Sequence, residues 1–456
     1  MPRLVAVVMA AGQGTRMKSA TPKMLHDLCG WPLVRWPVEA ARAAGADAVI
    51  VVGGPDRALE GHLPEGVELA VQERAQGTGD AVRSAAHLIE PDDTVIVMNG
   101  DVPLITGAAL TALVETHGTA QAAATMVTMV LPDPGAYGRV VRTAAGDVER
   151  VVEAKGGASD ATAEELQIRE VNAGIYAFGG AALTDALAKI RNENEQGEYF
   201  LPDTLPILIA DGHRVAAHVV DDPQLTLGVN DRVELARVRD LAQQRIHDAL
   251  GREGVTVVQG SSTSIDVTVT VGRDTTIEPG TVLRGATTIG AGCTVGPHVT
   301  ARDTQIGDGV TILHAYVVDS TIEDEVKVGP YVHLRGHTVL RKGAKAGTFV
   351  EMKNSDVGEG AKVPHLSYLG DADVGPKTNV AAANVTANYD GKNKHRTTIG
   401  ANVKTGVDNT FVAPVTIGDE AVIAAGSVIT EDVPPGALGV ARARQTNVTD
   451  YARRKG

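Results

Sequence analysis

An aliphatic residue recurs at almost every sixth position in the C-terminal half, and this spacing constrains the fold more than any other feature of the sequence. The repeat begins at Ile265, slips by one residue at Ile306 and continues to about Val433. An α-helix repeats near 3.6 residues and a strand near 2, so neither explains a sustained period of six. Three hexads per triangular coil, each with an inward aliphatic and a small turn residue, do explain it. We predict a parallel β-helix of hexapeptide repeats, followed by a tail, over residues 252–456.

The N-terminal part opens with an apolar run that is typical of a buried strand. The run Leu4–Ala10 leads into Gly12-Gln13-Gly14-Thr15-Arg16-Met17, and Lys23 follows a few residues later. Backbone N–H groups of a glycine-rich loop can face phosphates because no Cβ intervenes. The third glycine of a dinucleotide fingerprint and the Gly-Lys-Ser/Thr ending of a P-loop are both missing. Taken alone, such a loop is more often a plain turn than a phosphate site.

Strand-like and helical patterns alternate over residues 1–230, which predicts an α/β doubly wound (Rossmann-like) domain. Ligands of such domains lie outside the carboxyl ends of the strands, and the predicted strand Val95–Met98 ends in Asn99-Gly100-Asp101, which puts Asp101 at such an end. Residues 231–251 have an apolar helical face. They form either a linker helix between two domains or the last helix of the first domain.

Charge and cysteine usage restrict the partners and the compartment. The formal net charge of −14 argues against a nucleic-acid surface and against an anionic membrane partner. The first apolar run is too short to span a bilayer and lacks the layout of a signal peptide. Cys29 and Cys293 lie far apart in sequence and are predicted to be reduced thiols. We therefore expect a cytoplasmic protein with no nucleic-acid partner and no membrane insertion.

The glycine-rich loop with Pro22-Lys23 resembles the signature of sugar-phosphate nucleotidyltransferases, and Asn99-Gly100-Asp101 and Gly228-Val229-Asn230 continue the likeness. The resemblance implies Mg²⁺ held by Asp101 and Asn230, with Arg16 and Lys23 stabilising charge during catalysis. The residues implied to contact UDP-N-acetylglucosamine are Met9, Ala10, Ala11, Gly12, Lys23, Gln72, Gly77, Thr78, Asn99, Gly100, Asp101, Gly138, Glu153, Asn172 and Asn230.

Polar residues and a break in the repeat mark a second candidate site in the C-terminal half. His365 and several other polar side chains occupy positions outside the predicted core. The period fails between Val380 and Ile399, so we expect residues 384–398 to leave the coil as a loop. An imidazole of ordinary pKa, about 6.5, can accept a proton from an amine at cellular pH. A surface histidine is nevertheless more often solvated than catalytic, and many such repeats are inert scaffolds.

In this order and over essentially the whole chain, the motifs resemble the bacterial family of bifunctional N-acetylglucosamine-1-phosphate uridyltransferase/glucosamine-1-phosphate N-acetyltransferases. The resemblance implies a left-handed β-helix, a homotrimer and two steps towards a cell-wall precursor. Acetyl-CoA acetylates glucosamine-1-phosphate, and UTP then uridylates N-acetylglucosamine-1-phosphate. The implied base is His365, oriented by Glu351. The implied phosphosugar contacts are Arg335, Lys353, Tyr368 and Asn379, and the implied acetyl-CoA contacts are Ala382, Asn388, Tyr389, Val407, Ala425 and Arg442.

The C-terminal half departs from the family pattern at several positions. Val407 stands where the family has a serine, Ala381 and Ala383 replace glycines, and Gly336-His337 replaces Pro-Gly. A lost hydroxyl donor costs about 1 kcal/mol of binding or transition-state stabilisation. One alternative is therefore a monofunctional sugar-1-phosphate nucleotidyltransferase whose β-helix only trimerises. A non-catalytic scaffold is the alternative from another class.

Overall fold

The chain forms two compact units, Met1–Ala242 and Gln243–Gly456. The computed structural model describes residues 2–135, 137–144, 146–152, 162–194 and 197–455. Helix α6 (Arg232–Arg252) carries the boundary between the units and covers the segment predicted to be helical. Over the described ranges, no helix combines the length and the apolarity that crossing a membrane requires.

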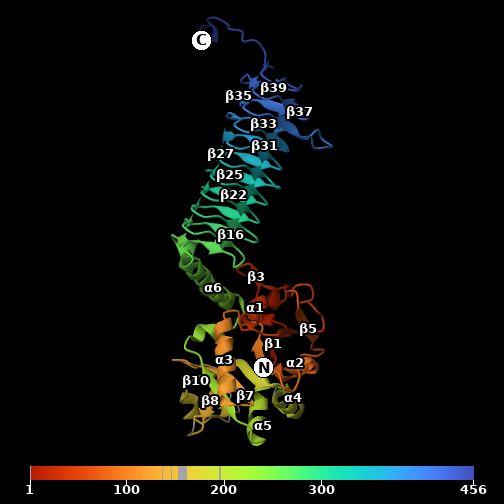
Figure 1. Ribbon diagram of the computed structural model, residues 1–456, viewed down its shortest axis with the longest axis vertical. Helices are drawn as coiled ribbons and strands as arrows, with labels where there is room; N and C mark the ends of the chain where they lie inside the picture. Colours follow the sequence, from red (N-terminus) through yellow and green to blue (C-terminus); the bar gives the residue numbers. More distant parts are fainter. Residues whose placement is uncertain (1, 136, 145, 153–161, 195–196, 456) are drawn as a thin grey trace. The chain divides into compact units, whose positions relative to one another are not determined.

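The first unit is built on one mixed sheet with the strand order β11-β7-β10-β6-β1-β4-β5 (Figure 1). β1 is parallel to both β4 and β6, whereas β10 runs antiparallel to β6 and β7. The α/β class predicted from the sequence is confirmed. The strands are β1 (Leu4–Met9), β4 (Ala48–Gly53), β5 (Val67–Val71), β6 (Thr94–Asn99), β7 (Ala124–Val130), β10 (Glu170–Gly179) and β11 (Val215–Val219), with β8 (Arg139–Arg142) and β9 (Val148–Val152) paired beside β10 and a separate ribbon of β2 (Asp27–Leu28) and β3 (Trp31–Pro32).

Helices cover both faces of this sheet, which explains why β1 is apolar at every position. Val5 and Val7 pack with residues of α2, α4 and α5 on one face, while Ala6 packs with residues of α1 and α3 on the other. Because the helices cover the faces of the sheet, a ligand can bind only beyond the strand ends, at the carboxyl ends of β1 and β6. The helices are α1 (Arg35–Ala43), α2 (Thr78–Ala85), α3 (Gly107–Ala120), α4 (Gly180–Lys189) and α5 (Thr204–Ala210).

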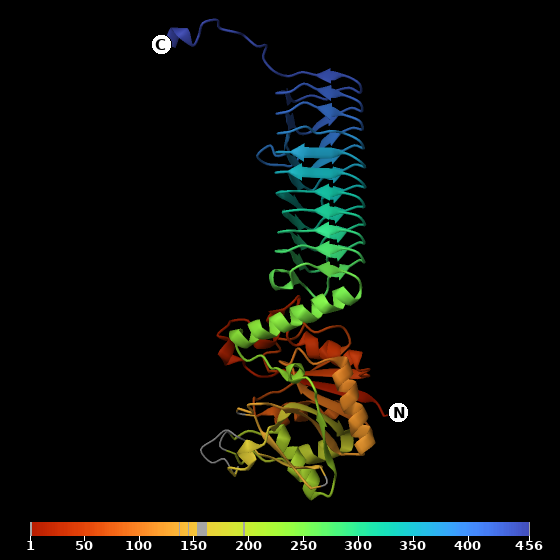
Figure 2. The same ribbon diagram turned by 90° about the vertical axis from the view of Figure 1, so that its left-hand side faces the viewer.

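The second unit is a stack of triangular coils made of parallel strands, each two to four residues long (Figure 2). Parallel strands form three faces, and each face begins with one of β12 (Thr256–Val257), β13 (Ser264–Ile265) and β14 (Thr270–Val271). We call them the β12, β13 and β14 faces. On the β12 face, a separate sheet of β35 (Lys404–Thr405), β38 (Val422–Ile423) and β40 (Leu438–Gly439) continues the stack beyond Asn379. The predicted left-handed β-helix of hexapeptide repeats is confirmed.

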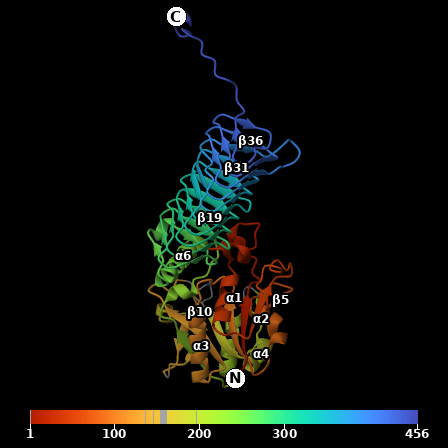
Figure 3. The ribbon, with the colours of Figure 1, turned by 45° about the horizontal axis from the view of Figure 1, so that its top comes forward.

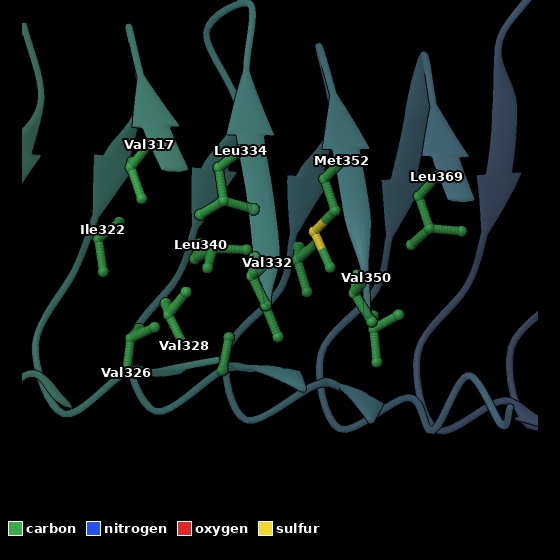
Figure 4. Packing of buried hydrophobic residues seen from close by; sticks show 14 of the residues in the cluster. Val317, Ile322, Val326, Val328, Val332, Leu334, Leu340, Val350, Met352 and Leu369 are labelled. Carbon is green, nitrogen blue, oxygen red and sulfur yellow. The ribbon is translucent and has the colours of Figure 1, made fainter. Parts of the chain in front are cut away.

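The interior of the β-helix is one continuous column of aliphatic side chains. On the β13 face, Leu334, Met352 and Leu369 stand directly above one another and point inward (Figure 4). The slip in the repeat has a simple cause: Ala301 is the inward residue before Ile306, so that interval is one residue short. Because the whole column is buried, burial of small aliphatic residues holds the coils together.

A loop leaves the stack between β33 (Val385–Ala387) and β34 (Thr397–Ile399), and we call residues 388–396 the arm (Figure 1, Figure 3). The predicted loop is confirmed, although it is shorter than residues 384–398 because Asn384 and Thr386 are buried in the stack. The arm is a tight hairpin in which Tyr389 pairs with Lys394. Hydrogen bonds from the Asn393 backbone, from His395 and from the Lys392 backbone lower the pKa of Asp390 to about 2. The charged Asp390 carboxylate therefore braces the arm at neutral pH.

Candidate functional sites

A cleft of about 530 Å³ opens at the carboxyl ends of β1 and β6 in the first unit. Its position is the one expected for a ligand of an open α/β sheet. Nine of the residues predicted from the sequence line it: Met9, Ala11, Gly12, Lys23, Gln72, Gly77, Thr78, Asn99 and Asp101. Ala10 and Gly100 lie behind the cleft, where their backbone N–H groups donate to Val52 and Met9. Glu198 also lines the cleft, and no sequence motif indicated it.

Four charged and polar side chains from distant parts of the chain converge at this cleft. Lys23, only 8% exposed, forms an ion pair with Asp101. Its Nζ also lies 3.4 Å from Asn230 Oδ1. Arg16 Nη2 donates to the same Asn230 oxygen at 2.8 Å. The structure thus brings together the two predicted catalytic cations and the two predicted metal ligands.

The same geometry shows that Asp101 and Asn230 fit a divalent cation. Both side-chain oxygens contact one positively charged group, the Lys23 ammonium, so they are close enough to share a cation. A carboxylate and an amide oxygen are ligands suited to Mg²⁺, which is held by few protein groups in nucleotide sites. In the part of the chain that the structure describes, no group of three or more His, Cys, Asp or Glu side chains could hold a metal. Any metal here therefore depends on substrate oxygens and water as well.

The opposite side of the cleft is shaped by Gln72 and Gly77. The Gln72 amide is buried and donates to the Gly77 carbonyl at 3.1 Å and to Asp80 Oδ2 at 2.9 Å. Gly77 has φ 102°, and a Cβ there would lie 2.5 Å from the Tyr199 carbonyl oxygen. Only glycine fits this position. Thr78 Oγ1 accepts the Leu201 backbone N–H at 2.9 Å, which fixes the start of α2.

The predicted sugar contacts lie near a second cavity of about 320 Å³, which shares Asn99 and Asp101 with the cleft and also includes Asn230. Asn172 lies at an irregularity in β10, where its backbone N–H donates to Gly138. Glu153 lies outside the described residues. Glu234 was missed from the sequence: its carboxylate accepts the Asn230 backbone N–H at 2.6 Å and so holds the proposed metal ligand.

In the second unit, His365 and three predicted acetyl-CoA contacts occupy equivalent positions of successive coils. The column, which we call the His365 row, consists of His365, Ala382, Val407 and Ala425. Backbone bonds link the coils, because Ala383 N–H donates to His365 and Asp408 N–H donates to Ala382. The row runs along the corner between the β12 and β13 faces. An extended molecule such as acetyl-CoA would lie along this corner and contact successive coils.

The predicted phosphosugar contacts fall on two different faces. Arg335, Lys353 and Tyr368 lie on the β13 face, where Arg335 is paired in register with Lys353. Asn379 lies on the β12 face, between Lys362 and Lys404. Within one chain, the structure therefore brings three of the four residues together and leaves Asn379 apart.

Glu351 makes contacts other than the predicted one. Its Oε1 accepts hydrogen bonds from Arg335 Nε at 3.0 Å and Nη2 at 2.7 Å and lies 3.9 Å from His333 Nδ1. Over the described ranges, no hydrogen bond joins Glu351 to His365. Its role in orienting that histidine stays a prediction.

The remaining acetyl-CoA residues are differently placed. Asn388, at the base of the arm, is only 8% exposed, whereas Tyr389 next to it is exposed. Arg442 lies in the exposed tail after β40 (Leu438–Gly439). Ala383 has φ 58°, the left-handed conformation that favours glycine, so the alanine there is mildly strained.

Comparisons with known proteins cover both units. A MobA-like NTP transferase domain matches residues 6–168, and the bacterial transferase hexapeptide (six repeats) matches residues 268–303 and 396–431. The chain is 47% identical to the bifunctional protein GlmU of Streptomyces avermitilis, over 98% of this chain and 94% of that protein. It is 45% identical to the bifunctional protein GlmU of Brevibacillus brevis (99% and 98%) and 44% identical to that of Halalkalibacterium halodurans (100% and 100%).

Proposed function

This chain belongs to the family of bifunctional GlmU proteins, and we propose that it makes UDP-N-acetylglucosamine in two successive transfers. It is an enzyme with a nucleotidyltransferase unit and a hexapeptide-repeat acyltransferase unit. The observation that carries the proposal is that full-length relatives named as bifunctional match both units of this chain. We assign uridylyl transfer to residues 1–230, acetyl transfer to residues 252–456 and a joining helix to residues 231–251. The substrates of both steps and the reduced thiols of Cys29 and Cys293 suit the cytoplasm.

In the uridylyl step, a phosphate oxygen of N-acetylglucosamine-1-phosphate attacks the α-phosphorus of UTP. The new P–O bond forms as the α–β bridging P–O bond breaks, and pyrophosphate leaves. No covalent enzyme intermediate is required, so positioning and charge neutralisation carry the catalysis. We assign stabilisation of the phosphate charge to Arg16 and Lys23, which both contact Asn230 Oδ1. We assign recognition of the uracil to Gln72, Gly77 and Thr78, which line the same cleft.

We assign Mg²⁺ to the oxygens of Asp101 and Asn230. When bound, the cation supplies neutralisation of the phosphate charge. The Lys23 ammonium, which now contacts both oxygens, would yield its place to a divalent cation held by Asp101 and Asn230 and would then be free to contact the phosphates. Glu234 holds Asn230 by its backbone during this exchange.

In the acetyl step, the amine nitrogen of glucosamine-1-phosphate attacks the thioester carbonyl of acetyl-CoA. A C–N bond forms, the C–S bond breaks, and coenzyme A leaves as the thiol. His365 accepts the proton that the amine loses and passes it to the departing sulfur, so that coenzyme A leaves as the thiol. We assign the acetyl-CoA contacts to the His365 row and the arm, and stabilisation of the oxyanion to the Tyr389 backbone N–H. Arg335, Lys353 and Tyr368 hold the phosphosugar.

We propose a homotrimer in which a second copy completes the acetyltransferase site. Asn379 cannot join Lys353 and Tyr368 within one chain because it lies on another face of the prism. An apolar corner row, made of Tyr331, Phe349 and Leu366, is also 56–60% exposed beside the same site. The Tyr331 and Phe349 rings stack at 5.0 Å. Exposed apolar stripes of this kind mark protein–protein interfaces. When such a stripe binds a different surface of the next copy and the rotation between copies closes, the copies form a ring, here of three chains.

Replacing an aromatic residue of the apolar corner row with a charge is expected to separate the subunits. In Tyr331→Glu, burial of the carboxylate against the neighbouring copy is unfavourable. Light scattering should give the mass of three chains for the wild type and one chain for the variant, with acetyl transfer lost and uridylyl transfer kept. Val258→Glu, at a similarly exposed apolar position in the first coil, is the control and should stay trimeric. A trimeric Tyr331→Glu would contradict this interface.

The two activities are tested separately on the full chain. Pyrophosphate release from UTP and N-acetylglucosamine-1-phosphate with Mg²⁺ measures the first unit, and thiol release from acetyl-CoA and glucosamine-1-phosphate measures the second. We expect both. Pyrophosphate release without thiol release would favour a monofunctional nucleotidyltransferase with a trimerising β-helix.

A further inference from the structure

A buried carboxylate without an assigned role lies at the base of the arm. Asp371 is 7% exposed, and each of its oxygens accepts a different side-chain amide. Oδ1 accepts from Asn354 Nδ2 at 2.6 Å, and Oδ2 accepts from Asn388 Nδ2. The Asp371 carbonyl also accepts the Thr397 backbone N–H at 3.1 Å, where the chain returns from the arm. One residue therefore fastens both ends of the arm to the coil below it.

The surroundings keep Asp371 ionised. Burial opposes the charge, but the hydrogen bonds from Asn354 and Asn388 and the nearby Lys353 and Lys394 ammonium groups together lower its pKa below the ordinary value. Lys394 belongs to the arm and faces Lys353, whose own pKa it lowers. The arm thus presents a cation beside a residue of the proposed phosphosugar site.

Gly370, the residue before Asp371, shows how closely the arm meets the proposed substrate residues. A Cβ at Gly370 would lie 2.4 Å from Tyr368 Oη and 2.7 Å from Asn388 Nδ2. The phenol and the amide therefore meet over this glycine. A movement of Asn388 would therefore change the space beside the Tyr368 hydroxyl.

We propose that Asp371 is a positioning residue of the acetyltransferase site, which holds the Asn388 amide and the start of the arm where they meet acetyl-CoA. This inference rests on the proposed function of the second unit. A charge-assisted hydrogen bond is stronger than a neutral one, so a carboxylate holds the amide more firmly than a neutral acceptor would. The buried position of Asp371 excludes water that would compete for the same amide.

The direct test is Asp371→Asn in the full-length trimer. Asparagine keeps the size but has one acceptor oxygen, so one of the two amides must face an NH₂ group. We expect the KM for acetyl-CoA to rise about tenfold, with kcat changed less than about threefold and uridylyl transfer unchanged. Asp356→Asn is the matched control: that carboxylate pairs with Arg341 on the β14 face, and its loss should leave acetyl transfer intact. An unchanged KM in Asp371→Asn would overturn the inference.

A double variant tests whether Asp371 acts through Asn388. If it does, Asp371→Asn combined with Asn388→Ala should be no worse than Asn388→Ala alone, whereas additive losses would overturn the inference. Gly370→Ala, whose Cβ would displace both the Asn388 amide and the Tyr368 hydroxyl, should raise the KM for acetyl-CoA and for glucosamine-1-phosphate together.

Hydrogen exchange separates this inference from the proposed function. Asp371→Asn should speed exchange of the His395 N–H, which donates to the Asn388 carbonyl at 2.8 Å. Faster exchange in a chain whose wild type transfers no acetyl group would mean that the proposed function failed and the anchoring did not. An unchanged exchange rate would refute the anchoring itself.

Discussion

Lys23→Met is expected to lower kcat/KM for uridylyl transfer by about 10²–10³ while acetyl transfer stays unchanged. Methionine keeps the length and apolar stem of lysine but removes the ammonium that meets both Asp101 and Asn230. The loss should appear in kcat, because charge on the phosphates grows towards the transition state. Pyrophosphate release at saturating UTP with Mg²⁺ measures it.

A matched variant separates this loss from a general effect on the loop. Lys18 belongs to the same N-terminal segment but is exposed. Lys18→Met should therefore retain uridylyl transfer. If both variants were equally impaired, the lower activity would result from the loss of positive charge in this segment and not from the contacts of Lys23. If Lys23→Met kept full activity, the assignment of Lys23 to catalysis would be wrong.

His365→Asn is expected to lower acetyl transfer by about 10²–10⁴ without affecting uridylyl transfer. His365 is exposed, so its replacement removes a proton acceptor rather than core packing. The amine must lose a proton as the amide forms, and an asparagine side chain cannot take it. Thiol release from acetyl-CoA measures the loss.

His337→Asn provides the control on the same unit. His337 is exposed and has φ 62°, a conformation that asparagine tolerates. Its replacement should leave both activities intact. Acetyl transfer that survives in His365→Asn would show that another group is the base, and the His365 row would then be a binding surface only.

The sequence predicts the β-helix well because its period reports burial directly. Ile277, Leu283 and Ile289 follow the period and point into the prism. The period breaks after Ala301 and again before Val317, because the intervals from Ala301 to Ile306 and from Ile312 to Val317 are each one residue short. Counting positions along the repeat would also have predicted that Asn379 and Tyr368 lie on different faces. Their inward-pointing neighbours, Val380 and Leu369, belong to the β12 and β13 faces.

Residues that position other site residues could not be predicted from the sequence. Asp101 could be expected at a strand end, but Asn230, more than a hundred residues away, was indicated only by resemblance. Glu234 and Asp371 carry no motif, because their role is to hold Asn230 and Asn388 through contacts that the fold creates. Glu153 lies outside the described residues, so its contact with the sugar stays a prediction.

The most direct test of the bifunctional assignment starts from glucosamine-1-phosphate, acetyl-CoA, UTP and Mg²⁺ with the purified wild-type chain. We predict UDP-N-acetylglucosamine, with one coenzyme A thiol and one pyrophosphate released per product molecule. Omitting acetyl-CoA should stop the formation of UDP-N-acetylglucosamine, since the uridylyl step uses the acetylated sugar. UDP-N-acetylglucosamine formed only when N-acetylglucosamine-1-phosphate is supplied ready-made would contradict the account.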